Sequence, residues 1–255
     1  MIKFFRKIRQ KLLSENRFSK YLIYAVGEIL LVVIGILIAV QINNINEQNK
    51  TYQKQRDYLM LIKAEMVSNL SAVLKEEQKL STLLEGTREF ISLRDRTTID
   101  VSEKELSSTW SKIFSKSFTF QYENGALTEL KSSGGLKDIV NDSIRNALAS
   151  WEGRIQRVRL QEIALNEYIQ KGNNYLEKNG AFRVIFDSGG GSEWLKIEKS
   201  SSDNSNKFLL DSQEFENILI FSIASGEFLY GSIYPEIEKD IHLLLSMIDN
   251  ELNQK

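Results

Sequence analysis

The sequence predicts a mainly α-helical protein: a single transmembrane helix followed by an elongated extracytoplasmic helical bundle, with a small β-hairpin insertion as an option near residues 181–199. Residues 21–42 form an almost uninterrupted apolar run. One proline in 255 residues favours long helices, because helix interiors exclude proline. Apolar residues also recur at heptad spacing in two later stretches, as they do in helices that pack along a seam.

The apolar run from Tyr21 to Ile42 carries a single charge, Glu28, between Leu22 and Val40. At about 1.5 Å per residue the run gives a helix of about 33 Å, enough to cross a bilayer core of about 30 Å. It is too long for the apolar region of a signal peptide, about 7–15 residues, and no A-x-A cleavage site follows it. We therefore expect an uncleaved anchor.

Charge is distributed unevenly around this anchor. Residues 1–20 carry a net charge of +6, and residues 43–255 carry a net charge of −6. The positive-inside rule predicts that residues 1–20 are cytoplasmic, residues 21–42 cross the membrane and residues 43–255 are exported. In the first segment Phe5, Ile8 and Leu12 share a helical face amid basic residues, which suits an amphipathic helix on anionic lipid or a simple topology signal.

The N-terminal third resembles a known family. The segments MIKFFRKIRQKLL and SKYLIYAVGEILLVVIGILIAVQINNINE are similar to a family of uncharacterised single-pass membrane proteins of Bacteroidota, and ELKSSGGLKDIVNDSIRNAL (129–148) matches more weakly. The resemblance implies a bacterial inner membrane, a cytoplasmic N-terminus and a periplasmic C-terminal domain. It implies no reaction, because the family has no assigned activity.

Four residues of the span are candidates for a helix–helix contact in the membrane: Gly27, Glu28, Gly35 and Ala39. Small residues at this spacing let two helices approach closely. A carboxyl group is costly in an apolar span, so Glu28 is a functional candidate. It either bonds to another helix, from a second copy or from a partner, or is a tolerated acid near the interface.

Beyond the span, a heptad pattern predicts that the helix continues as a stalk over about 43–58 and enters a bundle that covers about 59–255. We expect this helix to end around Leu93. The pattern consists of Ile45, Tyr52, Leu59, Met66, Val73 and Leu80.

Residues 143–178 show the clearest periodicity in the soluble part, with Asn141 or Asp142 as the cap. Two residues interrupt the apolar seam, Glu162 and Gly172. We interpret Glu162 as structural, either hydrated or paired, with Arg159 three residues earlier as the local partner; a role in gripping a ligand is the alternative.

The remaining elements are shorter. Ser102-x-x-Glu105 is a capping box that predicts a helix over 103–115, and a helix over 126–131 should stop at the glycines 134–135. The stretch FTFQY (118–122) is too short to assign, and residues 181–199 alternate like two strands around SGGGS. A last helix should begin near 211, with Pro235 either kinking it or opening a second helix.

Few residues in the sequence indicate a catalytic or metal-binding site. Cysteine is absent, and the single histidine, His242, lies on a helix without a catalytic partner set. We expect no catalytic residues, no metal site and no cofactor.

The function that fits is a membrane-anchored protein whose periplasmic domain serves protein interaction or scaffolding. The alternative is a subunit of a larger envelope or transport complex, with a ligand sensor or an enzyme less favoured. The expected partners are the lipid bilayer and either a second copy or another membrane protein, and no nucleic acid.

Overall fold

The computed structural model describes residues 18–95 and 100–253. Within that part the regular structure is helical, and no strand is present. The chain divides into two compact units, with the boundary between Arg56 and Asp57. The mainly α prediction is therefore confirmed.

Helix α2 (Phe18–Arg94) begins in the first unit and ends in the second. It ends one residue beyond the predicted Leu93. The Arg94 guanidinium stabilises this end by donating to the backbone oxygen of Ser212 at 3.0 Å and to Glu216 at 3.1 Å. A basic residue in the last turn also favours the C-terminus of a helix through the helix dipole.

Two helical stretches are long and apolar enough to cross a membrane by length and composition. The first lies in α2 from Ala25 onward, and none of its most apolar window is buried in the chain. The second is Gln213–Asn253, of which 33% of the corresponding window is buried. The two candidates therefore differ in how much apolar surface the chain itself covers.

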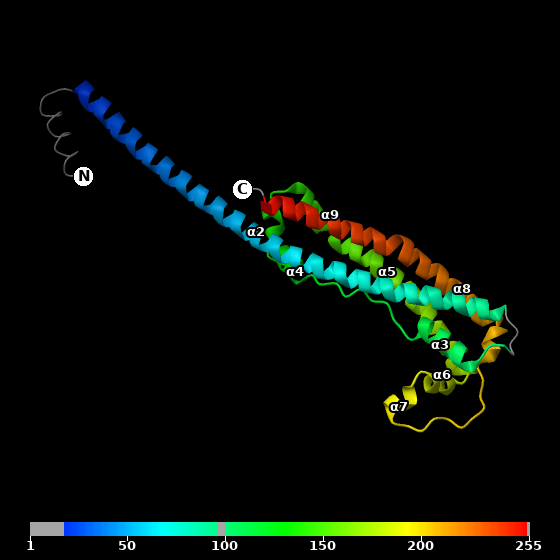
Figure 1. Cartoon of the computed structure of the whole chain (residues 1–255). Coiled ribbons are helices and arrows are strands. Elements are labelled where there is room, and N and C mark those ends of the chain that lie inside the picture. The colour runs from blue at the N-terminus through cyan, green and yellow to red at the C-terminus, as the bar shows by residue number, and fades with distance from the viewer. Residues whose placement is uncertain (1–17, 96–99, 254–255) are drawn as a thin grey trace. The chain divides into compact units, whose positions relative to one another are not determined.

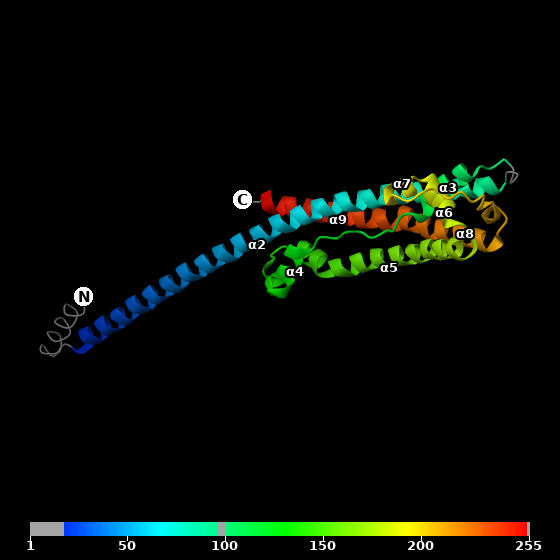
Figure 2. The same cartoon turned by 90° about the horizontal axis from the view of Figure 1, so that it is seen from below.

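In the second unit, residues 57–94 of α2 lie beside α8 (Gln213–Phe228) and α9 (Tyr234–Asn253) (Figures 1 and 2). Helix α5 (Asp142–Asn179) also packs against α8 and α9. Two ion pairs show the relative direction of α2 and the last two helices. Lys63, near the start of residues 57–94, contacts Asp249 at 2.5 Å, and Arg94, at the end, contacts Glu216. The residue numbers run in opposite directions, so α2 is antiparallel to α8 and α9. Helix α5 is also antiparallel to α8 and α9, because Arg154 pairs with Asp240 and Gln161 bonds to Ser225. Helices α2 and α5 therefore both run antiparallel to the last long stretch.

Helix α5 buries its predicted seam. Asn141 caps the helix by accepting from the backbone N–H groups of Ser143 and Ile144. The buried residues are Ile144, Leu148, Trp151, Ile155, Val158, Glu162, Leu165, Ile169, Gly172 and Leu176. The two polar or small interruptions are thus part of the core.

Helix α3 (Glu103–Phe114) begins as the capping box predicts, with the Ser102 hydroxyl accepting from the N–H of Glu105 at 3.1 Å. Helix α4 (Gly125–Ser132) ends before Gly134, which adopts a left-handed φ of 71° and leads into the short 3-10 helix η1 (Gly135–Asp138). Residues 116–124, between α3 and α4, have no regular structure, and we call them the extended segment.

The option of a β-hairpin at 181–199 is wrong. Residues of this region form two short helices, α6 (Phe182–Ser188) and α7 (Gly191–Leu195), and the 3-10 helix η2 (Lys207–Leu210) follows. Phe182, Val184 and Phe186 alternate as in a strand, whereas Phe182, Ile185 and Phe186 have helical spacing, and so short an apolar run does not separate the two.

Pro235 lies in the first turn of α9, where its missing N–H costs least. Between α8 and α9 the chain takes a π-helical turn, η3 (Leu229–Ile233), in which one residue more than usual fits into the turn. Leu229 and Ile233 are both buried. Of the two expected outcomes, the structure has the second: a new helix, α9, begins at Tyr234 with Pro235 in its first turn.

Candidate functional site

The four residues predicted to make a helix contact lie on α2 in the first unit. Gly27, Gly35 and Ala39 are exposed, and Glu28 is half-buried. A Cβ atom placed on Gly27 or Gly35 would meet no atom within 4 Å. The structure therefore leaves both glycines open to a neighbouring helix.

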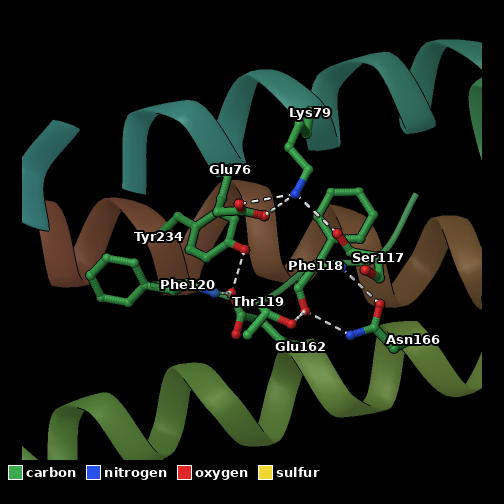
Figure 3. A network of polar contacts seen from close by, with 9 residues as sticks. All are labelled: Glu76, Lys79, Ser117, Phe118, Thr119, Phe120, Glu162, Asn166 and Tyr234. Atoms are coloured by element: carbon green, nitrogen blue, oxygen red, sulfur yellow. Dashed lines mark hydrogen bonds and ion pairs between the residues drawn. The ribbon is translucent and has the colours of Figure 1, made fainter. Parts of the chain in front are cut away.

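The second unit contains a network of buried polar side chains around the extended segment (Figure 3). Asn166 of α5 binds both backbone groups of Phe118: its Oδ1 accepts from the N–H at 2.9 Å, and its Nδ2 donates to the carbonyl at 2.7 Å. This two-point bond replaces the pair of bonds that a neighbouring strand would supply.

Glu162, one helical turn before Asn166, binds the next residue of the segment on the same edge. One of its carboxylate oxygens accepts from the N–H of Phe120 at 2.8 Å and from the hydroxyl of Tyr234 at 2.7 Å. Glu162 and Tyr234 are 3% and 0% exposed. Burial raises the pKa of Glu162, although these two hydrogen bonds favour the ionised form.

The other side of the segment is held by α2. Lys79 donates to the carbonyl of Ser117 at 3.0 Å while it pairs with Glu76 at 2.7 Å (Figure 3). Asn69, which is fully buried, repeats the two-point bond: it donates to the carbonyl of Glu123 at 2.8 Å and accepts from its N–H at 2.7 Å. We call Asn69, Lys79, Glu162 and Asn166 the clasp.

Helix geometry explains the spacing of the clasp on α5. Two residues of extended chain advance about 6.6 Å, and four residues of helix advance about 6.0 Å. Phe118 and Phe120 are two residues apart, and their partners Asn166 and Glu162 are four apart. An antiparallel helix thus presents one polar side chain for each alternate residue of the segment, while the rings of Phe118 and Phe120 are buried in the core.

Residues 28–184 match a family described as a family of unknown function, DUF6090. That range is more than half of the chain. The chain belongs to this family. No curated protein and no solved structure matches it.

The DUF6090 match contains the whole clasp and the extended segment, but not Tyr234, which lies beyond residue 184. It starts at Glu28 and so includes most of the apolar stretch of α2. The sequence resemblance was clearest over residues 1–50, whereas the family match extends through α5.

The clasp is structural in its chemistry. Its acceptors and donors are already engaged with backbone groups, and Glu162 and Tyr234 have almost no exposed surface for a substrate. The structural interpretation of Glu162 fits this geometry, but its expected partner was wrong. Arg159 points outward and pairs with Glu152 at 3.3 Å, because it lies off the buried face of α5.

Sequence reasoning did not single out Asn69, Lys79 or Asn166. Asn69 lies three residues after Met66 of the heptad pattern, where an amide among apolar neighbours signals a buried hydrogen-bonding role. Asn166 and Lys79 carry no such signal, since both fall beside the buried seam.

The remaining candidate, His242, is exposed on α9. Among the described residues no group of three or more His, Cys, Asp or Glu side chains is arranged to hold a metal ion.

Proposed function

We propose that this DUF6090 protein is a non-enzymatic, single-pass membrane protein whose helical domain binds other proteins, beginning with a second copy of itself. The observation that carries the anchor is the exposure of the apolar part of α2. None of its most apolar window is buried in the chain, and Leu31 and Leu37 are 71% and 61% exposed. A bilayer would cover this surface.

The second apolar stretch, α8 with α9, fits the domain better than the membrane. Leu219 and Ile241 are fully buried. Charged residues on α8 and α9 pair with the neighbouring helices, as Asp240 does with Arg154 and Glu227 with Arg88. Such charges would be costly in lipid.

The charge distribution supports the orientation. A net charge of +6 on residues 1–20 favours a cytoplasmic N-terminus, and a bacterial inner membrane would then place the second unit in the periplasm. A reporter enzyme that works only in the cytoplasm, fused after Lys255, should be inactive, and a periplasmic reporter at the same site should be active. Alkaline washing of membranes should leave the chain in the pellet.

The interaction role rests on an apolar stripe of α2 in the second unit. Met60, Val67 and Leu74 are 49%, 53% and 44% exposed, at heptad spacing. Ala64 and Ser71 lie between them and are also exposed, so the outer stripe (Met60, Ala64, Val67, Ser71, Leu74) follows alternating four- and three-residue steps without a charge. This is the spacing of a helix that pairs with another helix.

A second copy is the occupant that the sequence favours. Ala39 precedes Met60 by three heptads, so Ala39, though not Gly27 or Gly35, shares the heptad register of the outer stripe. A parallel partner of identical sequence would place each residue of the outer stripe beside its own copy.

Cysteine crosslinking in native membranes tests this proposal, because the chain has no cysteine of its own. Val67→Cys should give a covalent dimer on oxidation, and Glu167→Cys, on the exposed side of α5, should not. Equal yields from both sites, or no dimer from Val67→Cys, would contradict pairing through the outer stripe.

Glu28 favours the second candidate function, a subunit of a larger envelope or transport complex. A carboxyl in an apolar helix is stabilised by bonding to another helix. Glu28→Leu should keep the chain in the membrane while reducing the proteins captured with it, and Glu28→Gln should retain part of the capture. Equal capture by all three forms would leave Glu28 as a tolerated acid.

A further inference from the structure

A large cavity lies between α3, α5, α6 and α7 in the second unit. Its volume is about 790 Å³, within the range of ligand sites, and five aromatic rings border it: Trp110, Phe114, Phe182, Phe186 and Trp194. Trp110 and Phe114 are nearly buried, whereas Trp194 is 77% exposed. The rings form an apolar wall with an open rim, and the polar residues Asn173 and Glu177 also line the cavity.

Two glycines allow these rings to lie where they do. A Cβ atom on Gly172 would fall 2.0 Å from the ring of Phe114, and a Cβ on Gly191 would fall 2.6 Å from the ring of Phe186. Gly172 is the small residue that interrupts the seam of α5. Because it has no side chain, the ring of Phe114, which lines the cavity, can lie directly against α5.

A second cavity, of about 440 Å³, adjoins the first. Ser111 and Gly189 border both. Three lysines line the second cavity, Lys104, Lys112 and Lys116, and no acidic side chain does. Hydroxyl groups complete its lining: Thr82, Ser107, Ser108, Ser111 and Ser188.

The lysines are not neutralised to the same extent. Lys112 forms an ion pair with Glu89 at 2.7 Å. Within the described part of the chain, Lys104 and Lys116 take part in no ion pair. The cavity is therefore a positively charged, hydroxyl-rich site next to an aromatic one.

Ser107 supplies an independent sign of a ligand. It is 2% exposed, and its hydroxyl has no hydrogen-bond partner among the described residues. The neighbouring hydroxyls of Thr109 and Ser111 instead donate to the carbonyls four residues earlier, at 2.9 and 3.0 Å. A buried hydroxyl without a partner lowers stability, so a bound acceptor would account for it.

We propose that the two cavities form one binding site for an organic anion with a flat apolar body. The body would stack among the aromatic rings, and a phosphate or similar oxyanion would accept hydrogen bonds from Lys104, Lys116 and the Ser107 hydroxyl. Lysine and hydroxyl groups are the donors that such anions take, and aromatic faces favour flat apolar groups.

Three soluble probes separate the two halves of the site. They are 1-naphthyl phosphate, which has both body and anion, inorganic phosphate, which has the anion alone, and 1-naphthyl glucoside, which has a neutral head. Equilibrium dialysis is run against the full chain in phosphatidylcholine nanodiscs, with empty nanodiscs as the blank. Naphthyl phosphate should bind at least about tenfold more tightly than either other probe, since the two contacts act together. Equal binding of the two naphthyl probes would overturn the proposal.

Variants assign the contacts. The double variant Lys104→Gln with Lys116→Gln should bind naphthyl phosphate about tenfold more weakly, because charge-assisted hydrogen bonds are lost. Its affinity for naphthyl glucoside should be unchanged. Lys137→Gln, at an exposed lysine of η1, is the matched control and should change neither.

Ser107→Ala distinguishes a hydroxyl that binds the ligand from a buried hydroxyl that only lowers stability. Removing a buried hydroxyl that has no partner should keep or raise the melting temperature of the free protein. If the hydroxyl serves the ligand, the same variant should bind naphthyl phosphate several-fold more weakly. Unchanged affinity in both Ser107→Ala and the lysine double variant would show that these residues do not bind the anion.

Discussion

Two irregular segments of the second unit differ sharply in their surroundings. The extended segment, 116–124, buries Phe118 and Phe120, whereas residues 197–205 are exposed throughout. The first has polar side chains from two helices on its backbone, and the second lies mainly against water. The comparison shows that chain without regular structure can enter a core when helices supply the hydrogen bonds that a sheet would otherwise give.

The largest effect should come from removing the carboxylate of the clasp. Glu162→Ala leaves the N–H of Phe120 and the hydroxyl of Tyr234 buried without a partner, at a cost of about 3 kcal/mol of unfolding free energy. Urea unfolding of the full chain, followed by tryptophan fluorescence, measures it, because Trp110, Trp151 and Trp194 all lie in the second unit. Glu167→Ala, exposed on the same helix, is the control; a matching loss there would contradict the role of the clasp.

A smaller loss is expected at Asn166, which is only half-buried. Asn166→Ala removes both bonds to Phe118, but water can reach part of the site, so we expect a cost of about 1–2 kcal/mol. Asn174→Ala, at an exposed asparagine of α5, should change stability little by the same measurement. If the two variants behave alike, the two-point bond contributes nothing to holding the segment.

The raised pKa of Glu162 makes the clasp sensitive to pH. The folded state binds the proton more tightly than the unfolded chain, whose carboxyl has a pKa near 4.5. Stability from this group is therefore greatest below that value and falls as pH rises through the folded pKa, by at most about 1.4 kcal/mol per pH unit. Glutamine does not titrate, so Glu162→Gln lacks this contribution. The free energy of unfolding of the unmodified chain minus that of Glu162→Gln should therefore fall as pH rises. A flat difference would mean that Glu162 titrates normally.

The smallest effect is expected in the exposed segment. Ser201 is exposed in a stretch without regular structure, so Ser201→Ala should alter the free energy of unfolding by less than about 0.5 kcal/mol. A loss above about 1 kcal/mol would show that residues 197–205 are held as firmly as the extended segment, and would remove the contrast between them.

Periodicity in the sequence predicted the long helices because each one buries a single face. The seam of α5 and the caps at Ser102 and Asn141 are local patterns, and the structure follows them. The extended segment could not be placed in this way. Its partners Asn69 and Asn166 lie about 50 residues away on either side, and nothing local reports such contacts.

The errors have the same origin. At 181–199 a seven-residue helix and a short strand would bury similar residues. Helix α6 is packed against α3, a contact that lies far away in sequence and that the local pattern does not report. At Glu162 the nearest basic residue in sequence was Arg159, but the true donors come from the extended segment and from α9. The candidate cavities also join residues from α3 to α7, which periodicity does not bring together.

The clasp has a consequence for the order in which the domain assembles. Residues 116–124 can bury their backbone only after Asn69 and Asn166 are both in place, and Tyr234 completes the bond to Glu162. During synthesis the segment emerges before α5 and long before α9, so its native partners do not yet exist. Contacts of such sequence separation form late and slow folding. We therefore expect the segment around Phe118 and Phe120 to stay open to proteases on a nascent chain until the C-terminal helix has docked.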